Sequence, residues 1–129
     1  MAGYDDVDRY VGPLLSQLGF EPDGVDEAIQ YGERPAWAVY YRGEDCKFQV
    51  CWSASEGGVD FMLSPLDAPN EFGLVNKSGQ WHYVLALSGT NDGEMTPSLD
   101  ATAGTWWAWR EALLETHLGT ARTALLANT

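Results

Sequence analysis

The chain has 129 residues, of which 45% are hydrophobic, and 19 acidic side chains against 7 Lys and Arg give it a net charge of −12. A surface this acidic repels nucleic-acid phosphates and anionic lipid headgroups, so the charge argues against nucleic-acid and membrane partners. The same charge would attract a basic protein partner and raise its encounter rate. The length and the apolar content predict one domain, residues 1–129.

The sequence has no feature that predicts export or membrane insertion. The opening Met-Ala-Gly-Tyr-Asp-Asp lacks the basic and apolar regions of a signal peptide. No apolar run approaches the roughly 18 residues that a membrane span needs. We therefore expect a cytoplasmic protein.

Residues 5–18 predict an amphipathic helix. Asp5 can cap its start, and Gly19 suits the position just after its end. Apolar residues recur at helical spacing at Val7, Tyr10, Val11, Leu14, Leu15 and Leu18. Pro13 conflicts with a straight helix because it has no N–H and its ring clashes with the preceding turn. We expect a kink near Gly12-Pro13, or else a short turn before a helix that starts at Pro13.

Residues 20–35 carry weaker signals. Residues 21–24 read Glu-Pro-Asp-Gly and predict a turn. Residues 25–31 fit an edge strand or one irregular turn of helix. If they form a strand, an even loop over 32–35 places Ile29 and Tyr31 on the more polar face of the sheet.

Residues 36–63 predict three antiparallel strands with strict alternation. A two-residue turn at Gly43 would pair Arg42 with Asp45, and the next turn would set Trp52 against Val59. One face is apolar and carries Trp37, Val39, Tyr41, Phe48, Val50, Trp52, Val59, Phe61 and Leu63. The other face is predicted to be solvated and carries Ala38, Tyr40, Lys47, Gln49, Cys51, Asp60 and Met62.

The remaining sequence predicts a loop over 64–80, a strand over 81–87, a second loop over 88–104 and a long helix. Thr102 or Thr105 can cap this helix, and Gly119 is a candidate for its end. Its apolar stripe consists of Trp107, Leu114, Leu118, Ala121 and Leu125. Together the elements predict an α+β fold: an antiparallel β-meander sheet flanked by an N-terminal and a long C-terminal helix.

The sequence contains no pattern that predicts catalysis, a cofactor or a metal. It lacks the phosphate-binding, nucleophile-elbow and zinc-protease motifs. Cys46 and Cys51 fall five residues apart on one predicted strand, too far apart for a disulfide, so both are expected as free thiols. The two histidines, His82 and His117, fit packing or surface roles. We therefore expect no catalytic residue, no cofactor and no metal.

Aromatic residues suggest a protein-binding surface instead. Six Trp and six Tyr are many for this length, and Trp, Tyr and Met are enriched in interface cores. Trp109 lies nearly opposite the stripe of the last helix, and Tyr40 and Met62 lie on the predicted solvated face. The acidic partner-binding candidates are Asp60, Asp92 and Glu94.

Parts of the sequence resemble small bacterial immunity proteins, which neutralise polymorphic toxins. The resemblance lies in Leu-Leu-Ser-Gln-Leu-Gly-Phe at 14–20, Val-Tyr-Tyr-Arg-Gly at 39–43 and Phe-Gln-Val-Cys-Trp at 48–52. It covers residues 4–63 and a C-terminal helix of suitable length. It implies a non-enzymatic, cytoplasmic protein that binds and occludes a basic toxin.

Two other functions remain open. Size, charge and layout are also similar to type III secretion chaperones, so a secretion or assembly chaperone is the alternative. A small enzyme of unknown chemistry is the third possibility. The sequence leaves open whether the chain is a monomer or a homodimer.

Overall fold

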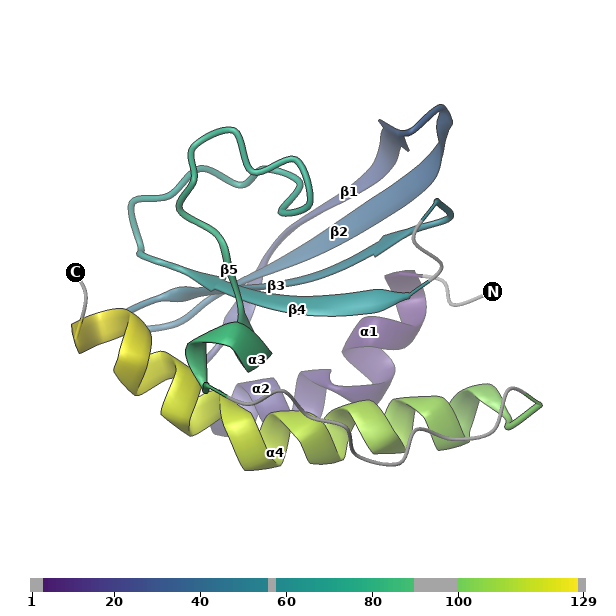
Figure 1. Cartoon of the computed structure of the whole chain (residues 1–129). Coiled ribbons are helices and arrows are strands. Elements are labelled where there is room, and N and C mark those ends of the chain that lie inside the picture. The colour runs from purple at the N-terminus through teal and green to yellow at the C-terminus, as the bar shows by residue number, and fades with distance from the viewer. Residues whose placement is uncertain (1–3, 56–57, 90–99, 128–129) are drawn as a thin grey trace.

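The computed structural model describes residues 4–55, 58–89 and 100–127. Five antiparallel strands form one sheet in the order β1-β2-β3-β4-β5, with helices on one face and an irregular segment across the other (Figure 1). The predicted α+β class is therefore confirmed. The elements are α1 (Tyr4–Tyr10), α2 (Gly12–Gln17), β1 (Glu21–Tyr31), β2 (Arg34–Arg42), β3 (Lys47–Ser53), β4 (Val59–Ser64), β5 (His82–Tyr83), α3 (Val84–Leu87) and α4 (Ala103–Ala127).

The N-terminal helix is divided near the proline, as the sequence predicts. α1 and α2 meet at Val11, and Pro13 occupies the first turn of α2, where its missing N–H leaves no helical bond unmade. Gly19 follows α2 with a φ of 87°, a left-handed conformation that suits glycine after a helix. Leu18 is 40% exposed, so its predicted place in the apolar stripe is wrong.

Edge strand β1 begins earlier than predicted. Residues 21–24 belong to this strand, so the predicted turn there is wrong. Pro22 is tolerated because an edge strand leaves one side of its backbone without a ladder partner. Of the two structures that residues 25–31 fit, the edge strand is the one observed, and the turn of helix is not. A two-residue turn with φ of 62° at Gly32 and 63° at Glu33 connects it to β2.

One of the two predicted registers in the meander is confirmed. Trp52 pairs with Val59 across β3 and β4, as expected. Between β2 and β3, Arg42 pairs with Lys47 rather than with Asp45. The error is a shift of two residues, which leaves every side chain on its predicted face. Cys46 lies in the longer loop over 43–46, just before β3 begins, and is buried in the core.

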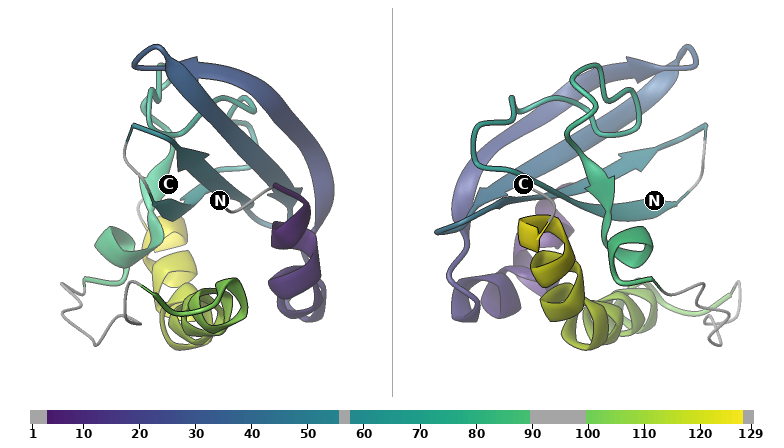
Figure 2. Two further views of the ribbon diagram at one scale, coloured as in Figure 1. Left: turned by 90° about the vertical axis from the view of Figure 1, so that its right-hand side faces the viewer. Right: turned by 60° about the vertical axis from the view of Figure 1, so that its left-hand side comes forward.

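The main core lies between the apolar face of the sheet and the helices α1, α2 and α4 (Figure 2). The predicted stripe of α4 is buried there. α4 continues through Gly119 to Ala127, so the predicted helix end at Gly119 is wrong. Gly119 is exposed, and Leu118, Ala121 and Leu125 keep the helix packed on both sides of it.

The prediction that the second face of the sheet is solvated is wrong. Residues 65–81, named here the covering segment, lie across it (Figures 1 and 2). Phe72 and Trp81 of this segment form a second buried cluster with residues of β2, β3 and β4. The sheet residues of that cluster are Ala36, Ala38, Tyr40, Cys51 and Met62.

Two polar side chains of β3 hold the covering segment in place. The side-chain amide of Gln49 donates to the Glu71 carbonyl at 3.0 Å and accepts from the Gly73 N–H at 2.8 Å. The ammonium group of Lys47 donates to the Ala68 carbonyl at 2.8 Å. Both side chains are buried, and each satisfies backbone groups that an irregular segment leaves without a ladder partner.

Hydrogen bonds within the covering segment also stabilise it. Asn76 donates to the carbonyl of Trp81 at 2.9 Å and accepts from its backbone N–H at 3.1 Å. The indole N–H of Trp81 donates to the Pro69 carbonyl at 3.0 Å. These bonds fold the segment into a fixed lid over the second cluster, although it contains neither helix nor strand.

The predicted strand over 81–87 is mostly wrong. Only His82 and Tyr83 pair with β4, and Val84 begins the short helix α3. Val84 is buried in the main core, and Leu87 packs against it. Because the chain turns into a helix, both side chains reach that core. In a continuing strand, Val84 and Leu87 would point to opposite faces of the sheet.

One arginine of α4, Arg122, contacts residues of two other parts of the chain. The guanidinium of Arg122 contacts the Asp45 carboxylate at 2.6 Å and donates to the Leu18 carbonyl at 3.3 Å. It also lies 4.9 Å from the ring centroid of Phe20. A single side chain thus joins the last helix, the β2–β3 loop and the end of α2.

No helix within the described ranges is long and apolar enough to cross a membrane.

Replacing Gln49 tests the covering of the second face. Gln49→Ala removes a buried bridge and leaves the Gly73 N–H and the Glu71 carbonyl without that partner, so the free energy of unfolding should fall by about 2 kcal/mol or more. The exposed Gln30→Ala on β1 should change it by less than about 0.5 kcal/mol. Urea titration measures both. Equal effects of the two substitutions would contradict the buried position of Gln49.

Acid should weaken the contact between Arg122 and Asp45. The hydrogen bond from Arg122 lowers the pKa of Asp45 below its ordinary value of 3.8. A lowered carboxyl pKa contributes stability above the unfolded pKa and loses it as the pH falls through the folded pKa. Asp45→Asn should therefore cost about 0.5–1 kcal/mol at pH 7 and much less at pH 2.5.

The exposed Asp67→Asn serves as the matched control for Asp45→Asn. Its effect on the free energy of unfolding at pH 7 should be less than about 0.5 kcal/mol, because its side chain is exposed. If Asp45→Asn lowered the free energy of unfolding equally at both pH values, the ion pair would not contribute to the pH dependence of stability.

Candidate functional site

The structure separates the six predicted partner-binding residues into three groups. Asp60 and Trp109 come together at one pocket. Tyr40 and Met62 are only 3% and 1% exposed beneath the covering segment, so their prediction as exposed anchors is wrong. Alternation placed them on the correct face, but that face is covered. Asp92 and Glu94 lie outside the described residues.

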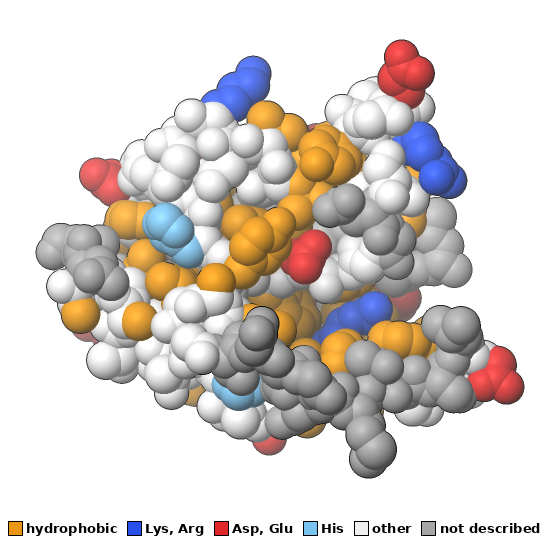
Figure 3. Space-filling view, viewed as in Figure 1, with side chains coloured by type: hydrophobic (Ala, Val, Ile, Leu, Met, Phe, Trp, Pro, Cys, Tyr) orange, Lys and Arg blue, Asp and Glu red, His pale blue; other side chains and the backbone are white. Residues whose placement is uncertain are grey.

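The pocket that joins Asp60 and Trp109 has a volume of about 310 Å³ and is named here the β4–α4 pocket. It opens between the first half of β4, the junction of β5 with α3, and the first half of α4. Figure 3 shows hydrophobic side chains gathered around a hollow on this side of the molecule. The lining residues are Val59, Asp60, Phe61, Tyr83, Val84, Leu85, Trp109, Arg110, Leu113 and Leu114.

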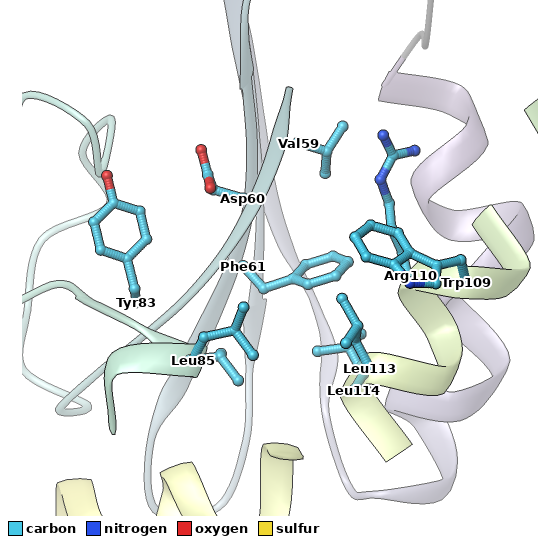
Figure 4. Close-up of a pocket in the computed structure, with 10 residues that line it drawn as sticks. Val59, Asp60, Phe61, Tyr83, Leu85, Trp109, Arg110, Leu113 and Leu114 are labelled. Atoms are coloured by element: carbon cyan, nitrogen blue, oxygen red, sulfur yellow. The ribbon is translucent and has the colours of Figure 1, made fainter. Parts of the chain in front are cut away.

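The pocket wraps around an edge of the sheet (Figure 4). Asp60 and Tyr83 lie on the side of the covering segment, because Asp60 pairs with Cys51 and Tyr83 pairs with Met62. Val59 and Phe61 point to the opposite side, toward α4. Strand alternation therefore gives the pocket a polar wall on one face of the sheet and an apolar wall on the other.

A cation lies on the apolar side. The guanidinium of Arg110 lies 5.5 Å from the ring centroid of Trp106 and 4.9 Å from that of Trp107. Burial lowers the pKa of Arg110, and the negative charge of Asp60 partly offsets this effect. The stacked arginine remains protonated at neutral pH because an arginine loses its proton only far above that range. The pocket thus combines one acid, one base and apolar walls.

Trp109 is a half-buried wall of this pocket rather than an isolated surface ring. Its ring meets that of Trp106 edge to face, with centroids 5.7 Å apart. The indole N–H of Trp109 is buried and has no hydrogen-bond partner among the described residues. The helical phase predicted correctly that Trp109 lies off the main stripe. It could not predict that β4 and the junction of β5 with α3 lie beside this side of the helix.

Sequence reasoning missed Arg110 and Tyr83. Arg110 follows Trp106 by four residues and Trp107 by three, a spacing that brings side chains together on a helix and could have signalled the cation–π contacts. Tyr83 is 43% exposed at the mouth of the pocket. Its position depends on the end of β5 after two residues, which no local residue pattern indicates.

The groups considered for metal binding and for thiol chemistry are the His, Cys, Asp and Glu side chains of the described residues. Within them, no group of three or more His, Cys, Asp and Glu side chains is arranged to hold a metal ion. Both cysteines are buried free thiols, as predicted. Burial raises the pKa of Cys46 to about 12 and raises that of Cys51 further, so neither forms the reactive thiolate readily.

Comparison with protein-family models, with curated proteins and with solved structures finds no match to this chain. The pocket itself is therefore the feature that bears on function. Its apolar walls and its two charged side chains are suited to binding.

The thiols give a direct test of burial. A disulfide reagent such as DTNB should react with the native protein at pH 8 at a rate on the order of 100-fold or more below that of the unfolded chain, because few thiolates are present and access is blocked. After denaturation without reductant, two thiols per chain should titrate. Fewer than two would contradict the free cysteines, and fast native reaction would contradict their burial.

Proposed function

We propose that this chain is a non-enzymatic protein-binding domain whose β4–α4 pocket receives an apolar side chain of a basic partner. One observation carries the proposal: a partly open apolar pocket on an acidic chain is lined by Trp109 and Tyr83 and carries Asp60 and Arg110. Trp, Tyr and Arg are the residue types most often found at the centres of protein interfaces.

The composition of the pocket supports a binding role over a catalytic one. Val59, Phe61, Leu113 and Leu114 form its apolar walls. Burying an apolar side chain of a partner against such walls gains about 25 cal/mol per Å² of apolar surface removed from water. Trp109 and Tyr83 can exclude water around that anchor, which is how the residues around an interface centre contribute.

The net charge supports a basic partner. At −12, the chain attracts a positively charged protein over a distance of roughly 8–10 Å at physiological salt. Long-range attraction raises the association rate, whereas the buried anchor sets how long the complex persists. Charge and pocket therefore serve two separate stages of binding.

The most specific form of this proposal is an immunity protein that binds and occludes a basic toxin in the cytoplasm. The resemblance of residues 4–63 to immunity proteins supports this form, as does the acidic charge. A secretion or assembly chaperone would instead hold an unfolded segment. The identity of the captured partner distinguishes the two.

Two tryptophans on one helix provide the matched pair for a test. Trp109 lines the pocket, whereas its neighbour Trp106 is also half-buried but does not line it. Immobilised wild type should capture a basic protein from the source cells. With that protein purified, Trp109→Ala should weaken binding by about 2 kcal/mol or more, and Trp106→Ala by much less. Calorimetry gives both affinities, and circular dichroism checks that each variant is folded.

Salt provides the second measurement on the same complex. Raising the salt from 50 to 300 mM should slow association markedly and change dissociation little, because screening acts mainly on the encounter. A partner that binds Trp109→Ala as tightly as wild type would contradict the role of the pocket. A captured acidic protein would contradict the role of the charge.

A further inference from the structure

Arg110 is a hydrogen-bond donor without an oxygen partner at the β4–α4 pocket. Of the described residues that line this pocket, it alone is basic. Its guanidinium lies against the rings of Trp106 and Trp107, which attract its charge but offer no oxygen to its five N–H groups. No hydrogen bond or ion pair joins these groups to another residue in the described part of the chain, and Asp60 acts on Arg110 only through its charge.

Trp109 adds a second donor at the same pocket. Its indole N–H is buried and has no hydrogen-bond partner among the described residues. A buried donor without an acceptor costs free energy, and a partly buried cation without an anion costs more. An indole and a guanidinium only donate, so both call for an acceptor, and the cation calls for a negatively charged one. A carboxylate is such an acceptor, and it binds a guanidinium in a planar, bidentate contact.

The apolar walls of the pocket lie beside this cation. Figure 4 shows Arg110, Val59 and Phe61 on the same side of β4, and Leu113 lines the same pocket. A ligand that fills this side of the pocket therefore needs an apolar group and a carboxylate close together. The last residue of a protein chain carries both on one Cα atom. Within a chain, an apolar side chain has only neutral peptide groups beside it.

We infer that the β4–α4 pocket receives the C-terminal residue of the basic partner, with its apolar side chain against Val59, Phe61 and Leu113 and its carboxylate on Arg110. This inference rests on the proposed function and specifies which apolar side chain of the partner is bound. Capture of a C-terminal carboxylate is a recurring mode of peptide recognition. The pocket volume of about 310 Å³ is at the lower end of the range for ligand pockets, which suits a single residue.

Charge selects the end of a basic chain over a small free acid. A free carboxylate with an apolar tail has the same two groups, but a chain of net charge −12 repels it. A basic protein is attracted as a whole, and its C-terminal carboxylate is carried with it. Even a protein that is poor in Asp and Glu ends in one carboxylate. A second copy of this chain is repelled for the same reason as the small acid.

Two capped peptides that differ only in their last group are the probe. Both have the sequence acetyl-Lys-Ser-Lys-Ser-Lys-Leu, and one ends in a free carboxylate whereas the other ends in an amide. The amide is the more positive of the two, so attraction by the acidic chain alone favours the amide. Pairing with Arg110 favours the acid. Calorimetry at 50 mM salt should show that the acid peptide binds wild type at least about tenfold more tightly than the amide.

Two arginines that lie on aromatic rings provide a matched pair of variants. Arg110→Gln should weaken binding of the acid peptide about tenfold and abolish the preference for the acid, because it removes the cation. Arg9 lies 5.3 Å from the ring centroid of Tyr10 but does not line the pocket. Arg9→Gln makes the same change of charge and should leave the preference as in wild type. Circular dichroism checks that both variants are folded.

A rearranged peptide and NMR locate the bound residue. The free acid acetyl-Lys-Leu-Lys-Ser-Lys-Ser has the same composition but separates the apolar side chain from the carboxylate, so it should bind at least about tenfold more weakly than the first acid. The indole N–H signal of Trp109 should shift when the first acid peptide is added. The signal of Trp81, which is buried in the second cluster, should stay in place.

The outcomes separate this inference from the proposed function. Lack of binding by the acid peptide, equal or tighter binding of the amide, or equal effects of Arg110→Gln and Arg9→Gln would overturn capture of a C-terminus. Isocaproate has the apolar group and the carboxylate of leucine without a peptide chain, and binding as tight as that of the acid peptide would assign the pocket to small acids instead. The proposed function would still stand if Trp109→Ala, but not Trp106→Ala, weakened binding of the captured partner. If neither substitution weakened it, the proposed function would fail.

Discussion

The structure depends on the burial of β3 from end to end. All seven residues of Lys47–Ser53 are buried, which requires cover on both faces of the sheet. The helices supply that cover on one face with apolar side chains. The covering segment supplies it on the other, where Lys47 and Gln49 must find hydrogen-bond partners in order to be buried at all. The backbone of the covering segment offers these partners. The side chains of β3 and the backbone of the covering segment therefore satisfy each other's hydrogen bonds.

The elements that alternate regularly could be predicted from the sequence. The strands over 36–63 and the buried stripe of the last helix follow from periodicity, because apolar residues there recur at periods of two and 3.6. The β2–β3 register could not be fixed this way, since a shift of two residues preserves the pattern. Cover of the second face could not be predicted either. Its polar residues bond to backbone groups of a distant loop, and a residue pattern carries no record of such bonds.

The candidate site could be predicted only in part for a related reason. Asp60 and Trp109 stand out locally, as an acid within a strand and as an aromatic residue off a helical stripe. Their meeting depends on β5 ending after two residues and on α4 crossing beside the edge that this leaves. Tyr40 and Met62 stand out in the same way, but they lie beneath Phe72 and Trp81. What separates the two pairs is the path of the covering segment.

The contacts of Arg122 have a consequence for how the chain reaches this structure. They join residues 77 and 104 positions apart in the sequence, and α4 closes the main core from the C-terminal end of the chain. Closing such long loops is slow compared with forming local structure. During synthesis, the apolar face of the sheet stays uncovered until α4 has left the ribosome. The nascent chain is therefore most prone to aggregation before α4, a helix of 25 residues, has emerged.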